Sequence, residues 1–189
     1  MLCVLQISEC ASGAKVEALR AELLALQLEE PHLHAVVFTE TDIMVERIRD
    51  MTKTHLKDFS LYELNPKMSA GARHDRILTF QKAEKKPKLF VMSYKIAACG
   101  VTLTAATRVF LMEPVLDPST EHQAAGRIHR LGQTREVFVK RFAYRASYEA
   151  AVIALHDKIK KGEVTVTDRR MSLRDALAFY ESVASVREN

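Results

Sequence analysis

The chain has 189 residues, of which 48% are apolar and 28% charged, and its 28 basic and 24 acidic side chains give a net charge of +4. This composition excludes a wholly disordered chain, and because no run of ~18 apolar residues occurs, we expect no membrane partner. The positive charge favours an acidic partner such as nucleic acid. Three cysteines without a Cys-x-x-Cys pair predict neither a disulfide framework nor a metal site, and they favour a reducing compartment.

Helix and strand signals alternate along the chain after a lead-in over residues 1–12. Apolar residues at helical spacing predict helices over 14–28, 41–56, 69–82, 120–131 and 147–160. Short apolar runs predict strands over 34–39, 59–64, 89–93, 108–112 and 137–142. Because this alternation is typical of βαβ units, we expect one three-layer α/β domain over 13–161, with a mostly parallel sheet of about five strands.

The pattern changes near the C-terminus. Residues 164–167 favour a short extended piece, and Ser172 with Asp175 has the spacing of a capping box before a final helix over 173–186. We therefore predict a C-terminal extension over 162–189 that adds a helix to the domain and does not form a second one.

The most informative stretch is EPVLDPSTEHQAAGRIHRLGQ, over residues 113–133. Thr120 and Gln123 have capping-box spacing at the start of a predicted helix, and Gly132 favours its end. At ~100° per residue, one narrow stripe of this helix holds Gln123, Arg127 and Arg130. A second stripe, about a quarter turn away and expected to pack on the sheet, holds Ala124, Ile128 and Leu131.

Two arginines held rigidly on a helix suit phosphate groups, because each guanidinium is always charged and offers a fork of donors. Such a pair can stabilise the charge on a transferring phosphoryl group. The alternative is a solvated basic face, on which Gln123 only caps the helix. A solvated loop is likewise the default interpretation of the basic run formed by Lys82, Lys85, Lys86 and Lys88.

The string Gln-x-x-Gly-Arg-x-His-Arg-x-Gly-Gln over 123–133 resembles motif VI of superfamily-two helicases, in particular the SWI/SNF-type chromatin-remodelling ATPases. Its last residue, Gln133, favours that type over RNA helicases of the DEAD-box kind, whose motif ends His-Arg-x-Gly-Arg. The stretch 91–103 resembles motif V, and 35–39 resembles motif IV. Within the family, Glu-Pro-x-x-x-Pro over 113–118 is similar to the SHPRH-like group of RING-containing ubiquitin ligases.

The resemblance implies the second, C-terminal RecA-like lobe of a two-lobe motor. The phosphate loop and the magnesium-binding acidic motif belong to the first lobe, and this sequence has neither, so we expect the chain alone to be inactive. The implied cofactors are ATP and Mg²⁺, held mainly by the first lobe of the same parent protein. The implied partners are that lobe, duplex DNA, nucleosomes, and ubiquitin-conjugation proteins through a RING outside this chain. The implied location is the nucleus.

The resemblance also assigns roles to residues at matching motif positions. Arg127 and Arg130 match arginine fingers that reach the γ-phosphate, and Gln123 matches the catalytic glutamine of the cleft. Gly100 and Glu113 match positions that support nucleotide binding. The positions that match the nucleic-acid track are Thr39, Ser93, Lys95 and Thr102.

Motif V departs from the family pattern at two places. Ala97 and Ala98 replace paired glycines, and Thr102 replaces an asparagine. Alanine does not adopt a positive φ cheaply, so these changes alter either the turn or the DNA contact. They motivate an alternative function, a catalytically silent DNA- or partner-binding module derived from such a lobe. A lobe of an RNA helicase is a third possibility, which Gln133 disfavours.

Overall fold

The computed structural model describes residues 2–7, 13–65, 67–97, 100–145, 147–164, 166–167 and 170–171. A parallel sheet of six strands forms its centre, in the order β1-β6-β5-β2-β4-β3. These strands are β1 (Leu2–Ile7), β2 (His34–Thr39), β3 (Ser60–Glu63), β4 (Lys88–Ser93), β5 (Arg108–Leu111) and β6 (Phe138–Tyr144). The helices are α1 (Ala14–Glu29), α2 (Asp42–His55), α3 (Ala70–Gln81), α4 (Tyr94–Ala97), α5 (Pro118–Ala125) and α6 (Tyr148–Lys160).

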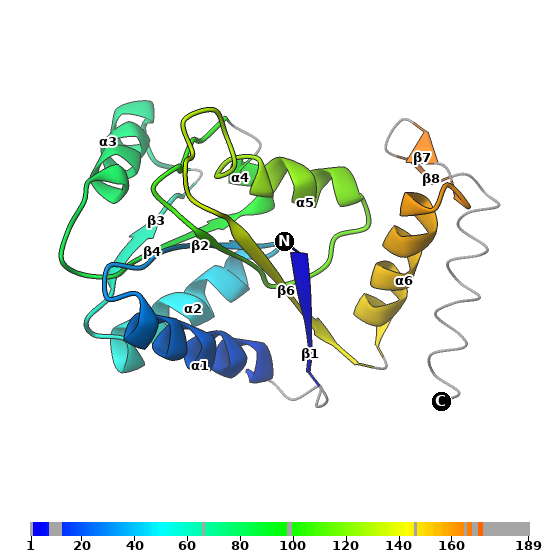
Figure 1. Ribbon diagram of the computed structural model, residues 1–189, viewed down its shortest axis with the longest axis horizontal. Coiled ribbons are helices and arrows are strands. Elements are labelled where there is room, and N and C mark those ends of the chain that lie inside the picture. The colour runs from blue at the N-terminus through cyan, green and yellow to red at the C-terminus, as the bar shows by residue number, and fades with distance from the viewer. Residues whose placement is uncertain are drawn as a thin grey trace.

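The helices cover both faces of the sheet, with α1 and α2 on one face and α3, α4 and α5 on the other (Figure 1). The alternation of side chains along β2 explains why both faces need cover. Val36 and Phe38 join the core beneath α3–α5, whereas Ala35 and Val37 join the core beneath α1 and α2. A strand buried on both faces is mostly apolar, so the apolar run over 34–39 predicted β2 correctly. The predicted three-layer α/β architecture is confirmed.

One strand was not expected. β1 lies within residues predicted as a lead-in, and it pairs with β6 at the edge of the sheet, with Leu2 opposite Val139. The sheet therefore has six strands where the sequence predicted about five. The domain limits themselves remain predictions.

Helix starts follow the side chains that can satisfy the free backbone N–H groups. The hydroxyls of Thr41, Ser69 and Ser147 accept hydrogen bonds from the first turns of α2, α3 and α6. At α5, however, the capping residue is Asp117 and not Thr120, and its carboxylate accepts from the Ser119 N–H at 2.9 Å.

The predicted helix over 120–131 is wrong in its second half. α5 ends at Ala125, and the chain continues in turns in which the N–H groups of Arg127 and Ile128 bond three residues back. A Cβ on Gly126 would lie 3.1 Å from the carbonyl oxygen of His122, so glycine allows this tight backbone. The long-range bond from the Leu103 N–H to the Arg127 carbonyl, at 2.9 Å, draws the chain away from the helix axis.

Near the C-terminus, β7 (Val166–Thr167) and β8 (Arg170–Met171) form an antiparallel pair. The predicted final helix over 173–186 lies outside the described residues, as does Ala98 of motif V. Within the described part of the chain, no helix has both the length and the apolar character needed to cross a bilayer.

Candidate functional site

The carboxyl ends of the central strands bring together three of the predicted site residues. Thr39 and Ser93 end the neighbouring strands β2 and β4 and lie opposite each other in the sheet, both buried. The Thr39 hydroxyl donates to the Glu113 carboxylate at 2.9 Å, and the Glu40 N–H donates to the same carboxylate at 3.0 Å. Burial raises the pKa of Glu113, although these hydrogen bonds act to lower it. Glu113 therefore accepts two hydrogen bonds that join the segment after β5 to the end of β2.

Tyr94 secures the same edge from the other side. Its hydroxyl donates to the Glu113 carbonyl at 3.1 Å, and burial raises the pKa of Tyr94 well above its ordinary value. Tyr94 therefore stays protonated and remains a donor at physiological pH. The side chains of Thr39 and Ser93 are enclosed here. Of the four residues predicted to contact nucleic acid, Lys95 is therefore the one that is exposed, while Thr102 is half-buried.

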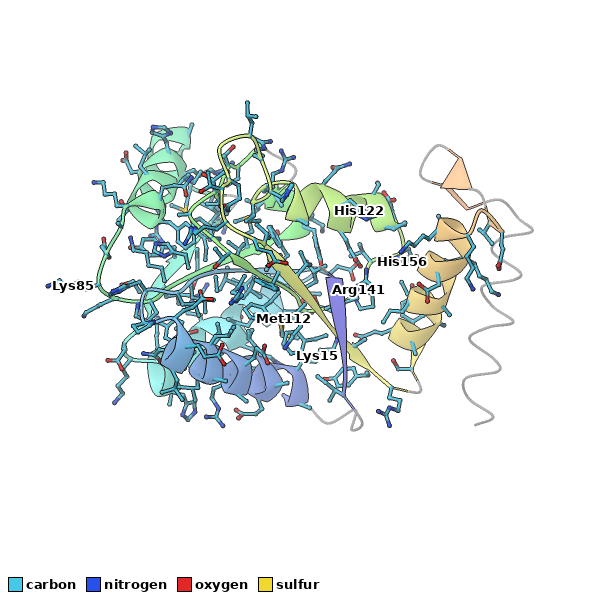
Figure 2. All side chains as sticks on the ribbon, in the orientation of Figure 1. Lys15, Lys85, Met112, His122, Arg141 and His156 are labelled. Carbon is cyan, nitrogen blue, oxygen red and sulfur yellow. The ribbon has the colours of Figure 1, made fainter. Side chains whose placement is uncertain are left out.

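A buried lysine, Lys15, contacts the segment that follows β5. Lys15, on the first turn of α1, is only 2% exposed, and its ammonium donates to the Met112 carbonyl at 2.7 Å (Figure 2). It also forms an ion pair with Glu149 of α6 and lies 4.7 Å from the centre of the Tyr144 ring. Lys15 thus joins α1, the segment after β5 and α6 in one cluster.

A second buried ion pair anchors α5. Arg141 of β6 and Glu121 of α5 are paired with side chains 7% and 4% exposed, and Glu121 also accepts from the Val115 N–H at 3.2 Å. His156 of α6 lies 2.7 Å from the Val115 carbonyl through Nε2 (Figure 2). Burial lowers the pKa of His156, so the imidazole stays neutral and Nε2 donates that bond.

The two arginines of motif VI do not share a helical stripe, which corrects the sequence prediction. Both lie in the turn after α5, with Arg127 half-buried and Arg130 exposed, while Gln123 remains exposed on α5 itself. Ala124 and Ile128 are buried as expected, but Leu131 is fully exposed and does not pack on the sheet. The helix ends before Leu131, so the periodicity no longer places that side chain inward.

The arginine turn, residues 126–133, is joined to the end of motif V. Arg130 donates from Nη1 to the Thr102 hydroxyl, and the Arg127 carbonyl accepts from the Leu103 N–H. Gln133 donates from Nε2 to the carbonyls of Thr104 and Ala106 at 2.8 and 2.9 Å. Gln133, the residue that distinguished this motif in the sequence, therefore links the arginine turn to the segment that follows motif V.

Gln81, the last residue of α3, holds the same segment from the other side. Its Oε1 accepts from the Ala105 N–H at 2.7 Å, and its Nε2 donates to the Thr102 carbonyl at 3.3 Å. Sequence analysis missed Gln81, because a single glutamine at a helix end carries no signal. It missed Lys15 too, although a lysine placed among the buried positions of an apolar helix is a usable signal.

Gly100 fits the predicted turn of motif V. Its φ is +85°, in the region that favours glycine, and a Cβ there would meet open space. The residue borders a cavity of about 290 Å³ between α3, α4 and the motif V turn. The residues around this cavity include Leu64, Arg73, His74, Ile96 and Gly100.

The basic run before β4 divides into two kinds of side chain. Lys82, Lys85 and Lys86 are exposed, as a solvated loop predicts. Lys88 is fully buried and donates to the carbonyls of Thr79 and Lys82 at 2.7 and 2.9 Å, so its ammonium closes the end of α3. For Lys88 the prediction of a solvated charge was wrong. No group of three or more metal-ligating side chains occurs among the described residues.

Comparison with known proteins identifies the family of this chain. The model of the helicase conserved C-terminal domain matches residues 14–132. The DNA repair protein RAD5 of Gibberella zeae is 36% identical over 152 residues, which are 79% of this chain and 13% of that protein. The human helicase-like transcription factor is 31% identical over 151 residues, covering 79% of this chain and 15% of its own length. A putative SWI/SNF-related regulator of chromatin from Arabidopsis thaliana is 35% identical over 149 residues, covering 78% and 17%.

Solved structures support the fold. The C-terminal part of the Fun30 ATPase domain superposes with a TM-score of 0.71 at 19% identity, over 93% of this chain and 54% of that chain. The SWI2/SNF2 ATPase core of Sulfolobus solfataricus, solved in complex with double-stranded DNA, gives a TM-score of 0.58 at 25% identity, over 75% and 29%.

The chain spans 13–17% of the length of these curated relatives. The SHPRH-like grouping predicted from the sequence fits them. Because the family model covers more than half of the sequence, the chain belongs to the helicase conserved C-terminal domain family, in which it is a second RecA-like lobe of the SWI/SNF type.

Proposed function

We propose that this chain is the second lobe of a DNA-stimulated ATPase and that it supplies Arg127 and Arg130 to the phosphates of ATP. The observation that carries the proposal is the arginine turn. It presents Arg130 at the surface, beside Arg127, on a backbone tied to motif V. A guanidinium that is accessible and fixed in place can stabilise transition-state charge without reorganisation, and an arginine finger contributes ~10³–10⁵ in rate.

The partner in this proposal is the first lobe of the same parent protein, which brings the phosphate loop and most of the Mg²⁺ site. ATP binds between the lobes, and closure places the arginine turn against the γ-phosphate. Gln123 is exposed on α5, and in this proposal it binds in the same cleft. Glu113 supports the site indirectly, because its carboxylate binds the backbone of Glu40 and the hydroxyl of Thr39.

Duplex DNA is the proposed nucleic acid. Lys95 is exposed at the start of α4 and supplies a phosphate contact. Phosphate contacts carry little sequence information, so binding is expected to depend strongly on salt and weakly on sequence. The relatives are a DNA repair protein and a chromatin regulator by name, which supports work on DNA in the nucleus, with nucleosomes as substrates. Ubiquitin-conjugation partners would bind through a RING outside this chain.

The test uses the parent protein with both lobes. ATP turnover is measured with and without duplex DNA for the wild type, for Arg127→Ala and for the control Arg20→Ala, whose half-buried side chain pairs with Glu17 on α1. We expect Arg127→Ala to lower kcat at least a hundredfold while nucleotide binding persists, and Arg20→Ala to have no effect. Equal turnover in all three proteins would overturn the finger assignment.

The alternative function, a catalytically silent binding module, rests on the motif V departures. If the wild-type parent binds duplex DNA but hydrolyses no ATP, that alternative replaces the motor. Stimulation by duplex RNA in preference to duplex DNA would instead support the RNA helicase lobe.

A further inference from the structure

The hydroxyl of Thr102 makes a contact within the protein and not at the surface of the expected nucleic-acid track. Its sequence position matches a DNA contact, but its Oγ1 accepts a hydrogen bond from Nη1 of Arg130. The side chain is half-buried between motif V and the arginine turn, whereas Lys95 stands in the solvent. The Thr102 side chain therefore contacts an arginine of the arginine turn.

The backbone that carries Thr102 is fixed by two side-chain amides. Gln81 contacts the segment over residues 102–106 at two points, the Thr102 carbonyl and the Ala105 N–H. Gln133 donates to two carbonyls in the same segment. Backbone groups between Thr102 and Ala106 are thus satisfied by amides from α3 and from the arginine turn, so the segment behaves as one rigid support.

The chemistry of the contact suits a catalytic arginine. A hydroxyl is a neutral acceptor, so it directs the guanidinium without neutralising its charge, and the remaining donors of the fork stay available for phosphate oxygens. The matched contrast within this chain is Arg141, whose charge is paired with the Glu121 carboxylate inside the protein. An arginine held as Arg141 is held could not serve a phosphoryl group.

We propose that Thr102 is a positioning residue for Arg130, and that Gln81 holds Thr102 in place. The inference rests on the proposed function, because it gives the arginine turn its geometry for ATP hydrolysis. In this chain the threonine that replaces the family's asparagine orients the finger and does not contact DNA.

The first test separates positioning from DNA contact in the two-lobe parent. Thr102→Val removes the hydroxyl but keeps the shape, and Thr102→Ser keeps the hydroxyl. We expect Thr102→Val to lower kcat about tenfold or more at saturating ATP and DNA, since small misplacements of catalytic groups cost up to ~10²-fold. The affinity for duplex DNA should be unchanged, and Thr102→Ser should restore turnover. A weaker DNA affinity with unchanged kcat at saturating DNA would overturn the proposal.

The second test asks whether the effect passes through Arg130. In an Arg130→Ala background, Thr102→Val should cause no further loss of kcat, because residues that act as a unit are not additive. Full additivity would overturn the positioning role while leaving the finger role intact. Unchanged turnover in Arg130→Ala alone would overturn both, which distinguishes the two failures.

Gln81 provides an independent check. Gln81→Met removes both hydrogen bonds at nearly constant volume and should reproduce the loss of kcat seen with Thr102→Val. The control is Gln27→Met, on α1. Thermal melting of each variant confirms that the parent is folded, and a normal kcat in folded Gln81→Met would remove Gln81 from the proposal.

Discussion

Two polar regions of the molecule hold their charges in opposite ways. Around α6, two ion pairs lie largely away from solvent. They are Lys15–Glu149 and Arg141–Glu121. In the arginine turn, Arg130 is exposed, and its Nη1 donates to the neutral hydroxyl of Thr102. A buried ion pair whose partners neutralise each other contributes to the fold, whereas a charge that is directed and not neutralised is available for a ligand. The comparison predicts stability effects in the first region and activity effects in the second.

The largest expected effect on stability comes from breaking the Glu121–Arg141 pair. Glu121→Leu leaves the Arg141 charge buried without its partner, which costs about 3–5 kcal/mol. It also leaves the Val115 N–H without the acceptor that Glu121 provides. Urea unfolding followed by circular dichroism measures the loss.

The double variant Glu121→Leu/Arg141→Met sharpens this prediction. It removes both charges, so it should recover part of the stability lost in the single variant. If the double variant is no more stable than Glu121→Leu, the cost lies in packing and not in an uncompensated charge.

Lys15→Met should have the next largest effect. The variant keeps the apolar stem but loses the bond to the Met112 carbonyl and the ion pair with Glu149, which together are worth about 2–3 kcal/mol. The matched control on the same helix is Arg20→Met, because its pair with Glu17 is exposed and worth less than about 1 kcal/mol. Equal urea midpoints for the two variants would contradict the role given to Lys15.

The sequence predicted the central strands well and the arginine turn poorly, for different physical reasons. A strand such as β2 is buried on both faces, so its apolar character is local and visible. The end of α5 depends instead on Gly126 and on the bond from Leu103 to Arg127, a contact across more than twenty residues of sequence. The apolar periodicity predicts a helix beyond such a position, because the pattern carries no information about distant partners.

For the candidate site, the sequence pattern predicted which residues could do chemistry but not which residues they contact. Motif VI marked Arg127, Arg130 and Gln123 as candidates from their order alone, and their roles remain predictions. Their surroundings could not be found in that way, since Gln81 and Thr102 acquire meaning only when α3 and motif V meet the turn. β1 was missed for a similar reason, because its partner β6 lies at the other end of the domain sequence.

The buried histidine of the first region predicts a dependence on pH. The pKa of His156 is lowered in the folded chain, so below about pH 6.5 the unfolded state binds a proton that the folded state does not. Stability should therefore fall as the pH drops from 7 toward 5. The groups that face His156 are Glu121, which opposes the shift, and Arg141, which adds to it.

His156→Gln can still donate to the Val115 carbonyl but does not titrate, so it should flatten part of the loss between pH 7 and 5. The control His55→Gln changes an exposed histidine of α2 and should leave the profile unchanged. Unfolding curves at pH 7, 6 and 5 measure the free energy of unfolding of the wild type and both variants. Identical pH profiles for all three proteins would show that His156 does not cause the loss of stability at low pH.

The smallest expected effect on stability belongs to Leu131, at the tip of the arginine turn. Its side chain is fully exposed, so Leu131→Gln should change the free energy of unfolding by less than about 0.5 kcal/mol. Under the proposed function the same residue faces the first lobe when the cleft closes, so the variant should lower kcat/KM for ATP in the two-lobe parent. Leu78→Gln, an exposed leucine of α3, is the control. A loss of stability in Leu131→Gln would show that the turn belongs to the folding core, and the contrast between the two polar regions would no longer hold.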